Sequence, residues 1–147
     1  MSKEETKELI LEVLGKGYLM SLGTQDEEGV WVADVIYVYD EEMNIYWMSD
    51  PETRHSQAIE QNNKVAGTIT ASGQGEDNLG IQFEGVAKKI EGERYDLALK
   101  HFAKRKKSQP KETDDILQGD LCYLLKPKKI GLICEKLFGF ERQDVKL

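Results

Sequence analysis

The apolar residues near the start of the chain recur at helical spacing. In the segment MSKEETKELILEVLG they form one stripe, which consists of Leu9, Ile10, Val13 and Leu14. Residues three and four positions apart share one face of an α-helix, so the stripe predicts an amphipathic helix. Ser2 and Glu5 precede it at the spacing of a capping box. The helix is expected to end at Gly15 or Gly17, because glycine commonly ends helices.

After this helix, apolar residues come in short runs rich in β-branched and aromatic side chains, which is typical of strands. The predicted strands are 18–24, 30–40, 45–49, 64–72, 80–91 and a last one, 121–140, which is interrupted near Pro127 and followed by a short tail. The first three are separated only by QDEEG and EEMN. Parallel neighbours need a crossover of a dozen or more residues, so these three strands are predicted to form an antiparallel meander.

Two more helices are predicted between the strands. Asp50 is a plausible N-cap and Pro51 suits a first helical turn, which predicts a helix over 51–62. A third helix is predicted from 93 to about 106 by the spacing of Tyr95, Leu99 and Phe102.

Six antiparallel strands with three helices at the margins predict a mainly β protein, and no linker divides residues 1–147 into more than one domain. Six strands most economically close into a small barrel, which removes the exposed edges of an open sheet. A sandwich is the competing architecture, and periodicity alone leaves both open.

Composition excludes several kinds of partner. The chain has a net charge of −7, which argues against nucleic acid or an anionic membrane as its main partner. It has no apolar run near the roughly 20 residues of a membrane span and no signal-peptide pattern, so a cytoplasmic location is expected. Cys122 and Cys134 form no CxxC or Cys/His cluster, so they are expected to be core thiols, and no metal site is predicted.

One basic run, KHFAKRKKSQPK at 100–111, stands out from the acidic background. It is either a solvated helix end whose lysines complement the helix dipole, or a patch for an anionic substrate or partner. His101 within it is expected to lie at the surface.

The stretch IYWMSDPETRHSQAIEQN at 45–62 carries the main candidate chemistry. Ser49 ends a predicted strand, and Thr53, Arg54 and His55 follow near the start of the next helix. A helix N-terminus with a hydroxyl, a guanidinium and an imidazole is suited to bind a phosphate. Alternatively, Thr53 is an ordinary cap and Arg54 pairs with the neighbouring Asp50 or Glu52. Aromatic residues of the nearby strands suggest a planar cofactor with a phosphate group, or else ordinary sheet packing.

The order of the motifs VWVADVIYVYD, IYWMSDPETRH, NKVAGTI and GIQFEGVAKKIEG resembles the split-barrel family that binds flavin mononucleotide (FMN), typified by pyridoxamine 5′-phosphate oxidase. The resemblance covers roughly residues 9–134. Within that family, TRHSQ, VAGT, GIQFEG and LFGFERQ are similar to a small bacterial subfamily without an established activity. The resemblance implies a six-stranded antiparallel split barrel and a homodimer with FMN between the two subunits. It also implies a flavin-dependent oxidoreductase that acts on a small-molecule substrate or electron donor.

The resemblance also implies a set of cofactor-binding residues. Ser49 and Arg54 match positions that hold the flavin phosphate, while His55 stands where lysine is commoner. The strand segment from Ala33 to Val38 is the one expected to lie along the flavin ring. Phe138, Phe140 and Arg142 of the tail are candidates to reach the partner's flavin, with ordinary packing of the tail as the alternative. The full implied set is Ala33, Asp34, Val35, Ile36, Tyr37, Met48, Ser49, Thr53, Arg54, His55, Phe140 and Arg142.

The pattern departs from the family's best-known enzyme in the tail. LFGFERQDVKL lacks the histidine of the arginine–histidine motif that grips pyridoxamine phosphate, so efficient oxidation of that substrate is not expected. No side chain is identified as a catalytic acid or base. Three alternatives remain open: a non-catalytic protein that binds or senses flavin, a split barrel that binds haem or deazaflavin, and a structural domain with no ligand.

Overall fold

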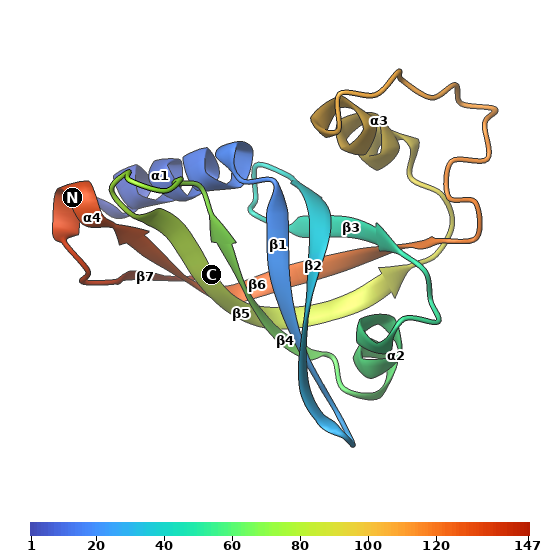
Figure 1. Cartoon of the computed structure of the whole chain (residues 1–147), viewed down its shortest axis with the longest axis horizontal. Coiled ribbons are helices and arrows are strands. Elements are labelled where there is room, and N and C mark those ends of the chain that lie inside the picture. Colours follow the sequence, from blue (N-terminus) through green and yellow to red (C-terminus); the bar gives the residue numbers. More distant parts are fainter.

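The computed structural model describes residues 1–147 as four helices and seven strands (Figure 1). Their order is α1 (Lys3–Lys16), β1 (Leu19–Asp26), β2 (Gly29–Tyr39), β3 (Ile45–Ser49), α2 (Arg54–Gln61), β4 (Lys64–Thr70), β5 (Leu79–Ile90), α3 (Tyr95–Lys104), β6 (Leu121–Cys134), α4 (Glu135–Phe138) and β7 (Gln143–Lys146). The three predicted helices and the first five predicted strands are all present, with β3 at the predicted bounds. The tail differs from the prediction, because it contains α4 and β7.

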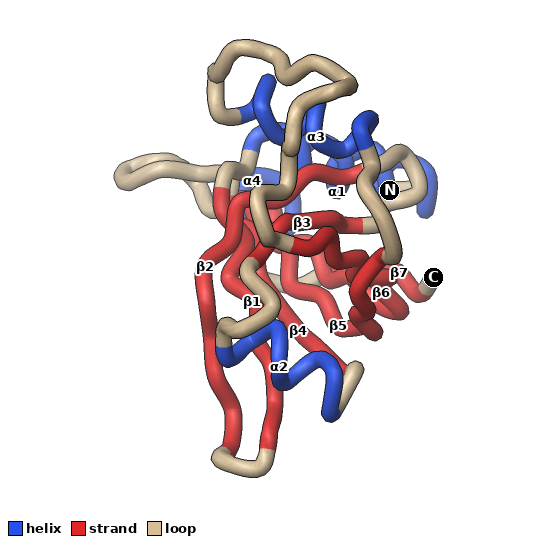
Figure 2. The backbone as a smooth tube through the Cα atoms, turned by 90° about the vertical axis from the view of Figure 1, so that its right-hand side faces the viewer, coloured by secondary structure: helices blue, strands red, loops and turns tan.

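The six strands from β1 to β6 form a closed antiparallel barrel. They pair in the order β3, β2, β1, β4, β5, β6, and β6 pairs back with β3. The predicted barrel is therefore confirmed and the competing sandwich is not. Figure 2 shows the helices at the margins of the strands, as expected.

The last barrel strand, β6, is continuous where an interruption was predicted. Its register against β5 shifts between Glu84 and Gly85, so that Gly85 faces Pro127 and Glu84 faces Lys129. Proline has no backbone N–H for the ladder, and a bulge lets the strand continue past it. On its other side, β6 pairs with β3 through Leu121–Leu125 and with β7 through Lys129–Leu132.

The N-terminal helix follows its sequence pattern closely. The Ser2 hydroxyl accepts a hydrogen bond from the backbone N–H of Glu5 at 3.1 Å, as the capping box predicts. Its apolar stripe packs against the barrel, with Ile10, Val13 and Leu14 fully buried. The helix ends at Gly17, where a side chain would collide with Ile69 and Tyr37. Glycine therefore lets the helix end lie directly on the barrel.

Aromatic and aliphatic side chains fill the barrel. Trp47 and Tyr123 stack there with ring centroids 5.7 Å apart. Offset stacking of this kind stabilises a core beyond the burial of apolar area alone. Cys122 and Cys134 are both buried with free thiols, which confirms the prediction of core cysteines. No helix is long and apolar enough to cross a membrane.

The helix after β3 starts later than predicted. Thr53, not Asp50, is the N-cap of α2, and its hydroxyl accepts a hydrogen bond from the backbone N–H of Ser56 at 3.3 Å. Asp50 instead closes the preceding turn by accepting from the N–H of Glu52 at 2.9 Å. Both side chains satisfy local backbone groups, but only Thr53 lies next to the first helical turn. Arg54 and His55 still fall in that first turn, as predicted.

Candidate functional site

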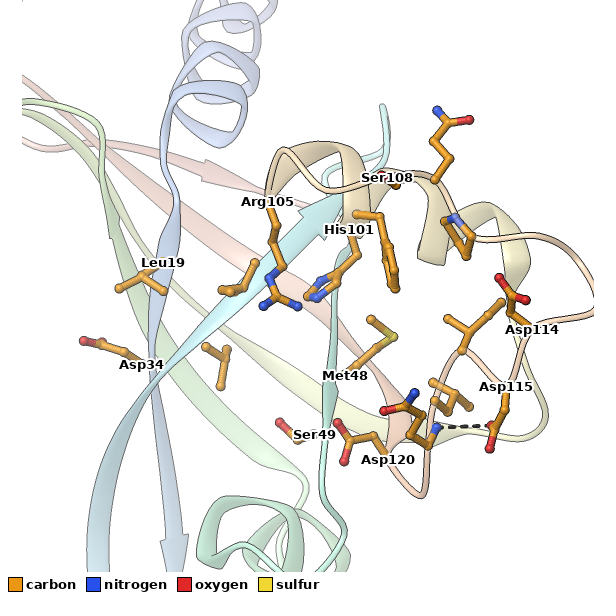
Figure 3. A pocket seen from close by; sticks show the side chains of 18 of the residues that line it. Leu19, Asp34, Met48, Ser49, His101, Arg105, Ser108, Asp114, Asp115 and Asp120 are labelled. Carbon is orange, nitrogen blue, oxygen red and sulfur yellow. Dashed lines mark hydrogen bonds between the residues drawn. The ribbon is translucent and has the colours of Figure 1, made fainter.

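The largest cavity, of about 1150 Å³, lies between the barrel and α3 (Figure 3). One wall comes from β2, the end of β3 and the start of α2, and the other from α3 and the segment 108–120. Six of the residues implied by the family resemblance line this cavity together: Asp34, Val35, Ile36, Met48, Ser49 and His55. Residues from three separate elements therefore meet at the place where a ligand was expected.

Ser49 and His55 form a buried polar pair on the barrel wall. The Ser49 Oγ lies 3.0 Å from His55 Nε2, and the Thr53 Oγ1 lies 3.3 Å from the same nitrogen. Ser49 is 8% exposed and His55 is 9% exposed. Burial lowers the pKa of His55, because the charged imidazolium is disfavoured away from water. The pair is therefore uncharged at neutral pH and can offer hydrogen bonds to a ligand, but no net charge.

Arg54 does not line this cavity. Its Nε and Nη2 donate to the two oxygens of Asp26, at 3.0 and 3.2 Å, and its guanidinium lies 4.6 Å from the centroid of the Trp31 ring. The hydrogen bond from Arg54 lowers the pKa of the Asp26 carboxyl. The sequence offered Asp50 or Glu52 as the partner, and that alternative is wrong. The actual partner is 28 positions away, on the β1–β2 hairpin.

The ends of the predicted ring-binding segment face elsewhere. Tyr37 is fully buried in the core, and its hydroxyl donates to the Leu14 carbonyl at 2.7 Å. Burial also raises the pKa of this phenol, so it stays protonated. Asp34, within the segment that does line the cavity, accepts a hydrogen bond from the Ser21 hydroxyl at 2.7 Å. Ala33 is absent from the lining.

The basic helix α3 contributes residues that the sequence interpretation misplaced. His101 was expected at the surface, but it is 8% exposed and faces the cavity (Figure 3). Burial, together with Arg105 and Lys104, lowers its pKa to about 4. The signal was present in the sequence, because His101 lies four positions after Leu97, which is also buried. The stripe that predicted the helix, led by Tyr95 and Leu99, is instead only half-buried.

Two lysines of α3 fasten the helix to β2. Lys100 Nζ donates to the Tyr39 carbonyl at 3.0 Å and Lys104 Nζ to the Tyr37 carbonyl at 2.6 Å. The Lys104 ammonium also lies 3.3 Å from the centroid of the Tyr37 ring, and burial lowers its pKa to about 8. The interpretation of 100–111 as a solvated helix end is therefore wrong for Lys104, which is half-buried against the strand.

The outer wall of the cavity is acidic. Asp114, Asp115 and Asp120 line it from the segment after α3 (Figure 3), and none of them takes part in an ion pair. The side chains of Asp114 and Asp115 accept hydrogen bonds from backbone N–H groups of their own segment. Arg105 of α3 is the only arginine or lysine that lines the cavity.

The tail residues lie away from the cavity of their own chain. Phe140 is 69% exposed, and Arg142 pairs with Asp144 at 2.7 Å and donates to Gln82 Oε1 at 3.2 Å. Both residues follow α4, at the other end of the molecule from α3 in Figure 1. Any contact between this tail and the cavity would therefore have to come from a second subunit. No group of three or more His, Cys, Asp or Glu side chains is arranged to hold a metal ion.

Comparison with known sequences finds relatives that are named as UPF0306 proteins. No family model matches the chain. It is 32% identical over 103 residues to UPF0306 protein YhbP of Escherichia fergusonii, an alignment that covers 69% of this chain and 70% of that protein. It is 30% identical over 107 residues to UPF0306 protein plu4501 of Photorhabdus laumondii subsp. laumondii, covering 71% of this chain and 75% of the relative.

Comparison with solved structures identifies the fold. General stress protein 26 from Bacillus anthracis superposes with a TM-score of 0.72 at 17% identity, covering 97% of this chain and 99% of that one. A putative pyridoxamine 5′-phosphate oxidase from Listeria innocua gives 0.68 at 14% identity, covering 87% and 98%. HutZ, the heme storage protein from Vibrio cholerae, gives 0.61 at 19% identity, covering 90% and 93%. Likeness at such identities concerns the fold alone, which is that of the split barrels.

Proposed function

This chain belongs to the UPF0306 family, and we propose that it is an FMN-binding split-barrel protein that acts as an oxidoreductase. The ligand would occupy the cavity between the barrel and α3, as part of a homodimer. The observation that carries this proposal is that β2, β3 and α2 bring six of the twelve predicted cofactor residues into one cavity. Pyridoxamine phosphate is not the proposed substrate, because the tail lacks the histidine expected for that reaction.

The chemistry of the barrel wall fits such a ligand. Val35, Ile36 and Met48 provide apolar surface for a flat ring. Ser49 and His55 lie beside it with hydrogen-bonding atoms that face the same space. Binding sites of this kind combine a mainly apolar lining with a few placed polar groups. The cavity volume of about 1150 Å³ leaves room for both a cofactor and a small substrate.

The protein's part in the reaction is to bind and orient rather than to transfer protons. A bound flavin supplies hydride or electron transfer by its own chemistry. When His55 carries its proton on Nε2, it donates to Ser49 and leaves the Ser49 hydroxyl free to donate to a ligand oxygen. The apolar wall and α3 would limit the access of water to the ring.

Exposed apolar residues on β2 support the homodimer. Val30 is 79% exposed and Val32 is 64% exposed, with Trp31 between them partly covered by Arg54. Val30 and Val32 project from the same face of β2, and a second subunit is proposed to cover them. The cytoplasmic location expected from the sequence forms part of the same proposal.

Absorption spectroscopy tests the proposal directly. The purified protein should take up FMN and retain paired bands in the blue and near-ultraviolet through gel filtration, at the elution volume of a dimer. Reduction of the bound flavin by a nicotinamide cofactor, followed by reoxidation in air, would support an enzyme. Retained flavin that no nicotinamide cofactor reduces would favour the non-catalytic binding protein. Protein that takes up no flavin would refute the proposal.

Haem is a second candidate ligand, and His101 is the observation that favours it. Its imidazole faces the cavity, makes no side-chain hydrogen bond to the protein and is neutral above about pH 4. Neutral imidazole is the form that binds metal ions. One solved neighbour of the same fold is described as a heme storage protein. A Soret band on haemin addition that His101→Ala abolishes and His55→Ala keeps would favour this ligand over FMN.

A further inference from the structure

We propose that Arg105 of α3 binds the anionic group of the ligand in this cavity, a part that the family resemblance assigns to Arg54. The inference rests on the proposed function in taking FMN, a phosphate monoester, as the ligand. The same chemistry would serve the phosphate or carboxylate of a substrate beside the flavin. Three features of the chain lead to it.

The first feature is that Arg54 already has an anion. Asp26 occupies both Nε and Nη2 of its guanidinium, and Trp31 covers one face. Glu28 adds a second carboxylate 3.9 Å from Nη1. To bind Arg54, a ligand phosphate would have to displace the Asp26 carboxylate from both of its hydrogen bonds. Asp26 belongs to the same chain and is therefore always close to Arg54, which makes it a strong competitor. Arg54 is thereby held on the hairpin side of α2, outside the cavity.

The second feature is the way in which α3 presents its faces. Lys100 and Lys104, four positions apart, hold one face against the carbonyls of β2. His101 and Arg105 repeat the same spacing one position later, and both line the cavity. Arg105 is the C-cap of the helix, and its backbone N–H donates to the His101 carbonyl at 3.2 Å. The two lysines therefore fix the orientation in which Arg105 reaches the cavity (Figure 3).

The third feature is the distribution of charge around the cavity. Arg105 takes part in none of the chain's ion pairs, so its guanidinium is available to an incoming anion. His55 and His101 are neutral at pH 7, because burial lowers both of their pKa values. Aspartates line the cavity on both walls, Asp34 on the barrel and three more on the outer wall, so Arg105 is the one residue of the lining that can attract an anion by its charge. A planar guanidinium can bind two phosphate or carboxylate oxygens at once, which neither histidine can do.

Paired titrations with FMN and riboflavin test this assignment. The two molecules share the ring and differ in the phosphate, so the ratio of their dissociation constants reports the contacts that the phosphate makes. Flavin fluorescence quenching gives both constants without any turnover. Arg105→Ala should lower the preference for FMN by about 10- to 100-fold, the range for a hydrogen bond to a charged group, and leave riboflavin binding nearly unchanged. Arg105→Lys should show a preference for FMN between those of the wild type and Arg105→Ala. Lysine keeps the positive charge but cannot bind two oxygens at once as the planar guanidinium does.

Two control variants distinguish a specific contact of Arg105 from a general effect of removing a positive charge. Lys107→Ala removes one positive charge just beyond α3 from an exposed side chain that does not line the cavity, and it should leave the ratio unchanged. Arg54→Ala should also leave the ratio unchanged. An Arg54→Ala variant that loses the preference while Arg105→Ala keeps it would overturn the inference in favour of the family pattern.

The source of the anion is decided by a further titration. If Arg105→Ala leaves the FMN preference intact, inorganic phosphate is titrated into the FMN-loaded protein by calorimetry. Weaker phosphate binding in Arg105→Ala would place a substrate's anion on Arg105 and support the proposal, and equal binding would refute it. If the wild-type protein binds neither flavin, the proposed function fails. In that case inorganic phosphate is titrated into the ligand-free protein. Weaker binding by Arg105→Ala than by the wild type would still support Arg105 as the anion-binding residue, and equal binding would refute it.

Discussion

The two walls of the cavity are built in different ways. On the barrel wall, the polar side chains are already paired: Ser49 lies 3.0 Å from His55, and Asp34 accepts a hydrogen bond from Ser21. Arg54, behind this wall and outside the cavity, is paired with Asp26. On the α3 wall, His101 and Arg105 face the cavity without a side-chain partner, and the aspartates beyond them have no cation. Paired groups mainly preserve the shape of a site, whereas unpaired groups are free to bind. We therefore expect the barrel wall to offer a ligand a surface and the α3 wall to decide which ligand binds.

This difference predicts that stability depends mostly on the barrel side. Trp47→Ala, which removes a ring that is 2% exposed and stacked on Tyr123, should lower the free energy of unfolding by about 3–5 kcal/mol. Ile116→Ala, at a half-buried position in the segment beyond α3, should cost less than about 1 kcal/mol. Urea denaturation followed by circular dichroism measures both. Equal losses in the two variants would contradict the division between the walls.

The buried histidine of the α3 wall should make stability depend on pH. Its pKa in the folded protein is about 4, below the ordinary 6.5, so the unfolded chain binds more protons between these values. Stability should therefore be full above pH 6.5 and fall by up to about 3 kcal/mol as the pH drops toward 4. His101→Gln should flatten this part of the stability curve. Parallel curves for the variant and the wild type would show that His101 is not buried as described.

On the barrel side, outside the cavity, the ion pair of Asp26 and Arg54 should make stability depend on pH in a more acidic range than His101 does. The pKa of Asp26 is lowered below its ordinary 3.8, so the pair stabilises the fold above that pH and its contribution is lost as the pH falls further. Asp26→Asn should be less stable than the wild type at pH 7 and should lose less on acidification to pH 2. Glu28→Gln, at the more distant carboxylate, serves as the control. Denaturation curves between pH 2 and 7 make the comparison.

The smallest effect is expected from the acidic outer wall. Replacing Asp114 and Asp115 together by asparagine should strengthen FMN binding by about two- to fivefold at low salt, because like-charge repulsion is removed. The gain should shrink at about 0.5 M salt, where exposed charges are screened. Glu112→Gln, in the same segment but outside the lining, should change little. An affinity that falls in the double variant would mean that these aspartates attract a cation instead.

The sequence predicted what depends on local pattern. Strand runs, short turns and the capping box at Ser2 each encode a local structure, and short connections imply antiparallel pairing. Barrel closure followed from the strand number together with the family resemblance. The helix α4 and strand β7 were missed because each has four residues, too few for a periodic signal.

Contacts between distant segments were the part that sequence reasoning could not supply. Nothing near Arg54 indicates that Asp26 will face it, since the pairing follows from how the hairpin curls against α2. The burial of His101 was in principle accessible from its spacing with Leu97. The residues used to predict α3, Tyr95, Leu99 and Phe102, lie on a different face of the helix and are only half-buried. The candidate cation changed from Arg54 to Arg105 because Arg54 is paired with Asp26 outside the cavity, whereas Arg105 lines it.

The shared edge of β6 has a consequence for the tail. One edge of β6 pairs with β5. On the opposite edge, the first half of β6 pairs with β3 and the second half with β7, a strand of four residues that carries Asp144 and Lys146. Removing that strand would uncover a row of backbone donors and acceptors between Lys129 and Leu132. Unpaired edges of this kind recruit strands from other molecules, and short charged edge strands prevent it. We therefore expect the tail to protect the barrel from aggregation, independently of any ligand in the cavity at the other end.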